Sequence, residues 1–410
     1  MKEAFSVLCL VLLVSVSEAA VTKPPLGTFL SCLRSWPSPE NPITDDIITA
    51  DNTTTFLSSY LSYTKNKRFT SPNYQTLMAI VKAKHGSDIQ ATVVCAKSNG
   101  IQIRIRSGGH DYEGLSYISS VPFVILDMFN LRSITVNVPS KKAWVQAGAT
   151  LGELYTKISD ASNTAMPKVA NGTKSGERTI AVVFYAQFLG RANELVSIMN
   201  QRLPELGLKR QDCLEMSWLN TTLFWEDLPV GTPTSVLLDR PSKPEKFFKS
   251  KSDYVKKPIP KEGIEKLWNV MLKFNNNIVY IEWNPYGGVM DKIPATATPF
   301  PHRKGNLFNV QYYTAWFDAN ATKSSLNMMK ELYEVAEPYV SSNPREAFLN
   351  YRDIDIGSNP SGETNVDEAE VYGSKYFLGN LKRLMEVKAK YDPENFFKNE
   401  QSIPPARVKQ

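Results

Sequence analysis

The chain has 410 residues, of which 42% are hydrophobic and 21% charged, and its formal net charge is +6. This composition is typical of a globular protein of about two domains and excludes a disordered or fibrous chain. The mild positive charge comes without a nucleic-acid motif, so the sequence predicts no nucleic-acid partner. After the first residues no run of about 18 apolar residues occurs, so no membrane span is predicted.

The N-terminus has the pattern of a secretory signal. Lys2 precedes the apolar run 5–16, and the small residues around Ala19 suit cleavage, which assigns residues 1–20 to a signal peptide. Behind it lie four Asn-x-Thr sequons, at Asn52, Asn171, Asn220 and Asn320. Together these features predict a secreted, glycosylated protein of the extracellular space or cell wall.

Residue periodicity predicts the elements in chain order. In the first half, strands are expected at 77–81, 101–105, 122–126, 134–138 and 143–147, and helices open at capping boxes Ser87–Gln90 and Thr150–Glu153. In the second half, a buried strand is expected at 179–185 and further strands at 279–283 and 307–317, among helices at 191–203, 261–274, 325–336 and 372–388. The helix at 191–203 is expected to turn Leu195, Ile198, Met199 and Leu203 inward. This order predicts an α+β fold whose second half is an antiparallel sheet with helices on one face.

The stretch Arg106-Ser107-Gly108-Gly109-His110-Asp111-Tyr112-Glu113-Gly114 follows the strand at 101–105. Paired glycines let the backbone approach a ligand closely, and successive N–H groups in such a loop can bind a phosphate. The stretch contains one of only three histidines in the chain. An ordinary glycine-rich turn with a solvated histidine explains the spacing alone equally well.

The whole string resembles the flavin-attachment loop of the berberine bridge enzyme-like family of plant secreted flavoprotein oxidases. The stretch Asn395–Pro404 resembles the C-terminal signature of the same family, and Cys213–Trp218 resembles another of its stretches. The resemblance implies an FAD-binding domain of the p-cresol methylhydroxylase (PCMH) or vanillyl-alcohol oxidase type, split around an α/β substrate domain. The expected boundaries are 21–170 for the FAD domain, 171–349 for the substrate domain, and 350–410 for a segment that returns to the FAD domain.

The resemblance also implies site residues. FAD would be joined covalently to His110 and would contact Arg106, Ser107, Gly108, Gly109 and Asp111, with Asn399 and Gln401 nearby. Tyr112 and Gln311 would be the catalytic-site residues, with a packed loop tyrosine as the alternative for Tyr112. Asn309 stands where relatives that oxidise alcohols often carry Lys. The implied partners are a small-molecule substrate and O2 as electron acceptor. No metal site is expected, and the protein is expected to be a monomer.

Two charged features are open to more than one interpretation. Glu282 is a candidate general acid or base, but a glutamate beside Trp283 on a strand is more often an exposed edge residue. A cluster of lysines is interpreted as a solvated loop with at most weak attraction to acidic wall polysaccharide: Lys249, Lys251, Lys256, Lys257 and Lys261.

Three cysteines remain once Cys9 leaves with the signal peptide. An oxidising compartment favours one disulfide and one odd thiol. The family resemblance implies the pair Cys32–Cys95, which leaves Cys213 free and, most simply, buried in a core.

The resemblance breaks between Lys168 and Thr179. Full-length relatives carry there a cysteine for a second covalent flavin bond, a glycine-rich run and further strands, about one small domain in all, and this chain carries none of them. The alternative function is therefore a catalytically impaired, truncated paralogue or gene-model fragment that binds little or no flavin. A secreted glycan-binding protein is a third interpretation, and it requires both motif matches to be coincidental.

Overall fold

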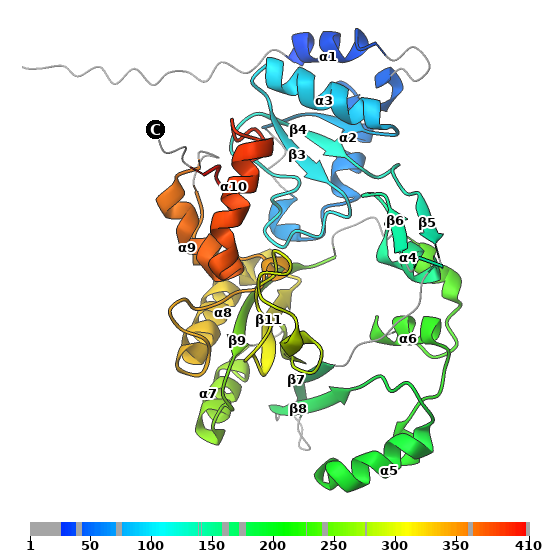
Figure 1. The fold of residues 1–410 in the computed structure, drawn as a ribbon, viewed down its shortest axis with the longest axis vertical. Coiled ribbons are helices and arrows are strands. Elements are labelled where there is room, and N and C mark those ends of the chain that lie inside the picture. The colour runs from blue at the N-terminus through cyan, green and yellow to red at the C-terminus, as the bar shows by residue number, and fades with distance from the viewer. Residues whose placement is uncertain are drawn as a thin grey trace, which may run out of the picture.

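A computed structural model describes residues 26–37, 43–70, 76–137, 139–140, 142–157, 164–171, 178–226, 228–239, 245–274, 277–359 and 364–406. The predicted signal peptide lies outside these residues. Figure 1 shows a four-stranded sheet with its helices at the top, a five-stranded sheet below it, and the C-terminal helices beside both. Among the described residues, no helix is long and apolar enough to cross a membrane.

The upper sheet is mostly parallel and buried on both faces. Its strand order is β1 (Ile47–Thr49), β2 (Leu77–Lys82), β4 (Phe123–Asp127) and β3 (Gln102–Arg106), with only the β1–β2 pair antiparallel. The helices α1 (Leu26–Arg34) and α3 (Gly86–Ser98) pack on one face and α2 (Thr53–Leu61) on the other. Two-sided burial explains why β2 and β4 are runs of apolar residues instead of alternating ones.

The start of α3 differs from the prediction. The Ser87–Gln90 capping box is wrong, because the helix begins at Gly86 and the carboxylate of Asp88 accepts hydrogen bonds from the backbone of Lys84 and His85, both at 2.8 Å. A carboxylate in the first turn satisfies these free N–H groups better than an uncharged side chain would.

The second capping box is confirmed at α4 (Leu151–Lys157). Glu153 accepts from the Thr150 backbone at 2.7 Å, and its own N–H donates to the Thr150 hydroxyl at 3.1 Å. Before α4, β5 (Ile134–Asn137) and β6 (Lys142–Val145) form a separate two-stranded sheet.

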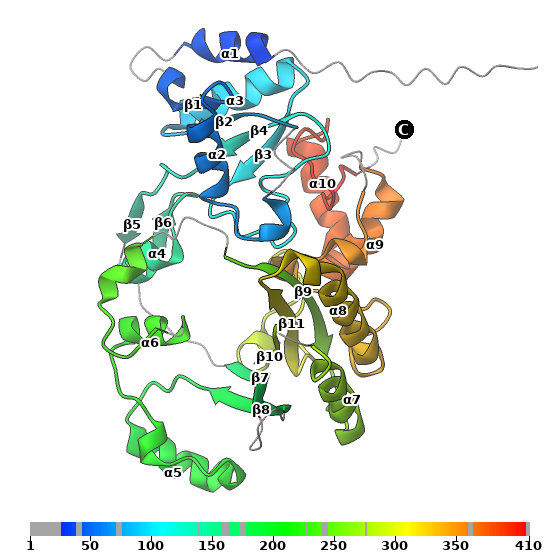
Figure 2. The ribbon, with the colours of Figure 1, turned by 180° about the vertical axis from the view of Figure 1, so that it is seen from behind.

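The lower sheet is wholly antiparallel and confirms the predicted architecture. Its order is β8 (Arg178–Tyr185), β7 (Thr164–Asn171), β10 (Ile278–Pro285), β11 (Phe308–Trp316) and β9 (Phe247–Val255). The helices α7 (Lys261–Met271) and α8 (Thr322–Ala336) cover one face of it, as Figure 2 shows from behind. The sequence analysis did not predict β7 or β9, and β7 begins upstream of the domain boundary expected at residue 170.

α5 (Ala192–Arg202) lies apart from both sheets in Figures 1 and 2, whereas α6 (Trp218–Trp225) contacts the end of β8, where Phe224 and Trp225 pack on Tyr185. The predicted inward face of α5 is wrong: Ile198 is 39% and Leu203 49% exposed. Likewise β8 is an edge strand and not a buried one, with Phe184 60% exposed. Both errors have one cause, because the described residues include no element that packs over these apolar side chains.

The C-terminal segment contains two helices where one was predicted. α9 (Val366–Phe377) ends at Leu378, whose φ of 46° breaks the helix, and α10 (Leu381–Tyr391) then runs in a new direction. The tail returns to the upper sheet, where the buried Arg104 of β3 donates to Glu400 at 2.8 Å. Short 3-10 turns, among them η2 (Lys67–Phe69), η10 (Leu349–Tyr351) and η11 (Ile354–Ile356), complete the connections.

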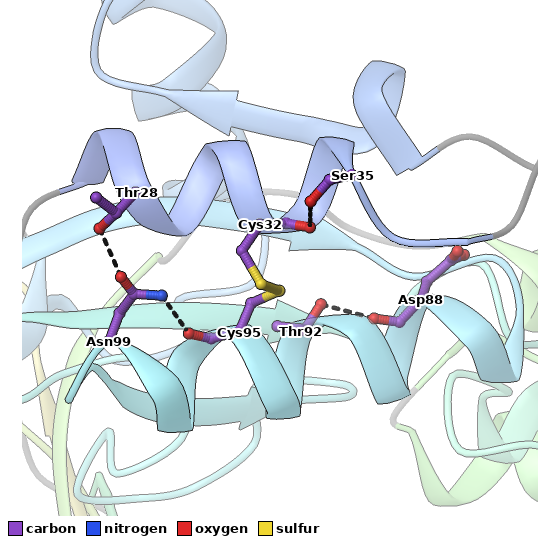
Figure 3. Close-up of a disulfide and its surroundings, with 7 residues drawn as sticks. All are labelled: Thr28, Cys32, Ser35, Asp88, Thr92, Cys95 and Asn99. Carbon is purple, nitrogen blue, oxygen red and sulfur yellow. Dashed lines mark hydrogen bonds between the residues drawn. A yellow bond between two sulfur atoms is a disulfide. The ribbon is translucent and has the colours of Figure 1, made fainter.

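The disulfide Cys32–Cys95 is confirmed and joins α1 to α3, with the two Cα atoms 5.7 Å apart (Figure 3). The expected burial of Cys213 is wrong, since this free thiol is half-buried and its Sγ lies 3.7 Å from the Lys209 carbonyl oxygen. Three of the sequon asparagines, Asn52, Asn220 and Asn320, are exposed. The side chain of the fourth, Asn171, lies outside the described residues.

The disulfide closes a loop across 63 residues of sequence separation. Its removal should destabilise the fold mainly by raising the conformational entropy of the unfolded chain. We expect the double variant Cys32→Ser, Cys95→Ser to lower the free energy of unfolding by about 2–4 kcal/mol. Urea denaturation followed by circular dichroism measures it. Cys213→Ser is the matched control and should leave the midpoint unchanged, and equal effects of the two variants would contradict this role.

Candidate active site

The loop after β3 holds its glycines for steric reasons. Gly109 has a φ of 67°, and a Cβ built there would lie 1.9 Å from the backbone oxygen of Tyr63. Only glycine fits such a position. The next residue, His110, is exposed on the loop surface. The loop therefore presents an imidazole beside a stretch of backbone that carries no side chain.

Arg106, at the end of β3, is fully buried and anchors the start of the loop to the sheet and to the backbone of α2. Its guanidinium pairs with Asp127 of β4 at 2.6 Å and donates to the backbone oxygens of Ser59 and Tyr60 at 2.8 and 3.0 Å. These partners lie within the domain, so the observed role of Arg106 is to support the loop. Ser107, next along, donates its hydroxyl to the Ala147 carbonyl.

Electrostatics favour the neutral form of His110. The protein packed around the loop disfavours a charge there, and the positive charge of Lys65 acts in the same direction, so the pKa of His110 is lowered. A neutral imidazole nitrogen retains the lone pair that bond formation requires.

Tyr112 and Gln311 are brought together across 199 residues of sequence. Nε2 of Gln311 donates to the Tyr112 hydroxyl at 3.2 Å and to the Ser250 hydroxyl at 3.1 Å. Asn66, which the sequence analysis missed, holds the backbone of Tyr112 against β9. Its buried amide donates to the backbone oxygens of Tyr112 at 3.2 Å and Phe248 at 3.0 Å.

One face of the lower sheet surrounds this contact with tyrosines. Tyr280 of β10 stacks on Tyr313 of β11, with ring centroids 4.8 Å apart. Tyr351, on η10, stacks on Tyr112 at 6.0 Å. Tyr351 was also missed as a site residue, although its neighbours 350–353 were expected to return to the flavin domain. Asn309, also on this strand pair, donates to the Asp253 backbone oxygen at 3.3 Å.

The C-terminal segment reaches the loop through Arg352. Its Nε donates to the Asp111 carboxylate at 2.6 Å, and its Nη1 to Oε1 of Gln401 at 3.3 Å. Nε2 of Gln401 donates in turn to the Asp353 and Gly357 carbonyls, and Asn399 accepts from the Gln401 backbone at 2.8 Å. These two tail residues are therefore bonded within the C-terminal segment, and Arg352 joins Gln401 to the loop.

Two lysines assigned to a solvated loop are buried on β9, which corrects that prediction. Lys249 is 2% and Lys251 3% exposed. Lys249 pairs with Glu113 of the flavin loop and, at 2.7 Å, with Asp353, and Lys251 pairs with Asp353 at 2.7 Å and with Asp355 at 2.8 Å. We call Lys249, Lys251, Glu113 and Asp353 the buried charge cluster, and the exposed Asp355 lies at its edge. Lys256, Lys257 and Lys261 are exposed as predicted.

The cluster keeps Lys249 charged. Burial alone lowers the pKa of an ammonium group, but here the carboxylates of Asp353 and Glu113 outweigh burial and raise the pKa. The sequence did carry a signal for it, because Lys249, Lys251 and Asp253 occur at every second position and so share one face of a strand.

Comparison with known proteins identifies the class. A profile described as "FAD binding domain" matches residues 78–176, and one described as "Berberine and berberine like" matches residues 347–404. The fold and these matches define an FAD-binding oxidoreductase of the PCMH type.

The chain belongs to the berberine bridge enzyme-like family. It is 62% identical over 529 aligned positions to "Berberine bridge enzyme-like 4" of Arabidopsis thaliana and 60% identical over 529 positions to "Berberine bridge enzyme-like 7", with 100% of each chain covered. Because the chain has 410 residues, at least 119 of these positions contain none of its residues. This agrees with the shorter middle segment noted in the sequence.

Solved structures share the fold. "Phl p 4, a grass pollen allergen with glucose dehydrogenase activity", superposes with a TM-score of 0.81 at 29% identity, covering 92% of this chain and 99% of the other. The berberine bridge enzyme from Eschscholzia californica superposes with a TM-score of 0.83 at 24% identity, covering 93% and 100%. Similarity along the whole length of this chain to members of the family favours this family over an unrelated glycan-binding protein.

The residues present fit a flavin. An exposed imidazole with a lowered pKa stands on the loop next to Gly108 and Gly109, and Tyr112 lies two residues further along the chain. Among the described residues no group of three or more His, Cys, Asp or Glu side chains could hold a metal ion.

Removing Lys249 tests whether the buried charge cluster supports the site. Lys249→Met keeps the side-chain volume but leaves Glu113 and Asp353 buried with less compensation, so we expect a loss of about 3–5 kcal/mol in the free energy of unfolding. Urea denaturation checks it. Lys266→Met, which breaks an exposed pair with Glu262 on α7, is the control and should leave the midpoint unchanged. A Lys249→Met midpoint equal to that of the control would show that the cluster contributes no stability.

Proposed function

We propose that the chain is a secreted FAD-dependent oxidase of a small molecule (an alcohol, a carbohydrate or an alkaloid) with O2 as the electron acceptor. The observation that carries the proposal is the hydrogen bond from Gln311 to Tyr112, because it brings the flavin loop against the substrate sheet. Bound FAD supplies the redox chemistry, taking a hydride from the substrate and passing its electrons to O2 to give H2O2.

In this proposal His110 is the covalent attachment point. Its exposure and lowered pKa support that role, since a neutral nitrogen is the nucleophile. Gly108 and Gly109 give the pyrophosphate access to backbone, and Ser107 and Asp111 complete the loop. The chain has no cysteine between Cys95 and Cys213, so no second covalent link is proposed.

The substrate would bind between the loop and the sheet. Tyr112, Tyr351 and Gln311 offer two hydroxyls and an amide from three separate segments, which suits orientation of a hydroxyl-bearing molecule. The glucose dehydrogenase activity in the description of Phl p 4 makes D-glucose a sensible first probe.

The remaining parts of the proposal follow the sequence. Residues 21–170, except for β7, and 350–410 would form the FAD domain around a substrate domain at 171–349, whose sheet β7 joins. Export would be directed by residues 1–20, with glycans on Asn52, Asn171, Asn220 and Asn320. The protein would act as a monomer, held at most weakly to wall polysaccharide by its exposed lysines.

Covalent attachment is tested by mass spectrometry of the protein purified from a plant or yeast secretion host. We expect the tryptic peptide that contains His110 to carry the mass of FAD, and His110→Ala to abolish that mass while sparing the fold. His85→Ala, a change at the start of α3, is the control and should keep the adduct. An unmodified His110 peptide from wild-type protein, with no flavin released on denaturation, would refute the proposal.

A further inference from the structure

Glu282 occupies the centre of the tyrosine-lined face. It lies on β10, which pairs with β11 on one side and β7 on the other, so the interpretation of Glu282 as an edge residue is wrong. The register sets Glu282 directly opposite Gln311, and such pairs have side chains on the same face with Cβ atoms about 4.5–5.5 Å apart. Through Gln311 it is one residue away from the Tyr112 hydroxyl.

The face that holds Glu282 is the one turned toward the flavin loop. On β10 the neighbouring residue Ile281 is fully buried against the helix layer, which directs Tyr280 and Glu282 to the opposite side. On that side Tyr280 packs with Phe248, Tyr313 and Tyr112. Glu282 is half-buried there, so its carboxylate is partly withdrawn from water and still accessible.

The described tyrosines and Gln311 on this face are poor proton acceptors near neutral pH. Burial raises the pKa of Tyr112, Tyr280 and Tyr351, and the negative charge of Glu282 raises each of them further. Burial, together with Tyr112, also raises the pKa of Tyr313. These phenols therefore stay protonated and act as donors. Gln311 is an amide, which is a poor proton acceptor.

Glu282 itself is suited to accept a proton. None of the ion pairs formed by the described side chains includes it, and burial raises its pKa while the Asn284 amide acts in the opposite direction. A base whose pKa moves toward the working pH transfers protons more effectively. β7 pairs with the edge of β10 that β11 does not occupy. Its backbone places Lys168 opposite Tyr280, two residues from Glu282.

We propose that Glu282 is the catalytic base of this site and accepts the hydroxyl proton of the alcohol or carbohydrate that the proposed function oxidises. This inference rests on the proposed function, which supplies the electron acceptor. The carboxylate takes the role that the uncharged Gln311 and Asn309 on the neighbouring strand cannot fill. The hydroxyl-bearing carbon would lie between Glu282 and Tyr112.

The step balances as a two-electron oxidation. An oxygen of Glu282 takes the hydroxyl proton while the C–O single bond becomes a carbonyl, and bound FAD would supply the acceptor for the hydride that leaves the carbon. Glu282 then returns its proton to water, and O2 would be the final acceptor of the two electrons, giving H2O2. The phenols of Tyr112 and Tyr351 donate hydrogen bonds and exchange no proton.

The test compares Glu282→Gln with wild type and with Glu334→Gln, a change to an exposed residue on α8. The probes are D-glucose and coniferyl alcohol, each mixed anaerobically with flavin-loaded protein while the flavin absorbance is followed by stopped flow from pH 4 to 9. We expect wild type to be reduced by at least one probe, faster as the pH rises through the pKa of Glu282. Glu282→Gln should be slowed about 10²–10⁴-fold and lose that acid limb, and Glu334→Gln should match wild type.

A second readout does not depend on turnover. The infrared difference between wild type and Glu282→Gln isolates one protonated carboxyl band, and we expect it to persist to a higher pH than that of an ordinary glutamate. Circular dichroism and flavin content confirm that the variant is folded and loaded.

The outcomes separate the two proposals. Wild type reduced by a probe while Glu282→Gln reacts at the same rate with the same acid limb would overturn the role of Glu282 and leave the oxidase proposal standing. Flavin-loaded wild type that neither probe reduces would count against both proposals.

Discussion

Lys249 carries a buried positive charge that three distant segments of the chain share. Moving an ammonium group out of water costs several kcal/mol, and only close carboxylates repay that cost. Those carboxylates are Glu113 from the flavin loop and Asp353 from the C-terminal segment, while Lys249 itself belongs to β9 of the substrate sheet. The charge is therefore stable only when loop, sheet edge and C-terminal segment are assembled, and the geometry of the site follows from that assembly.

The contacts around the buried charge cluster also join the loop, β9 and the C-terminal segment. Arg352 ties Asp111 to the C-terminal segment, and Asn66 ties the backbone of Tyr112 to β9. These bonds set the loop so that the Tyr112 hydroxyl lies within reach of Gln311. His110 remains exposed beside them, so the loop is rigid where it meets the sheet and open where the flavin would attach. The site thus depends on long-range polar contacts more than on the apolar core of either domain.

Local sequence signals predicted the parts of the structure that local physics decides. The strand and glycine-rich loop at 101–114, the capping box at Thr150 and the antiparallel sheet with helices on one face are all present. The Cys32–Cys95 pair, which the family resemblance implied, is present as well. The buried lysines were missed because a charged residue is expected to lie in water. The carboxylates that offset the cost of burying Lys249 are more than a hundred residues away in the sequence. The inward face assigned to α5 failed for the opposite reason, since periodicity shows that a face is apolar but not that anything covers it. Glu282 needed the strand register before its position opposite Gln311 could be known.

Hydrogen–deuterium exchange on wild type and Lys249→Met tests most directly whether one buried charge assembles the site. If it does, the backbone amides of residues 107–116, 247–255 and 346–357 lose protection together in the variant, while the α1–α3 region joined by the disulfide keeps its protection. Loss confined to 247–255, with the flavin loop and the C-terminal segment unchanged, would contradict the account.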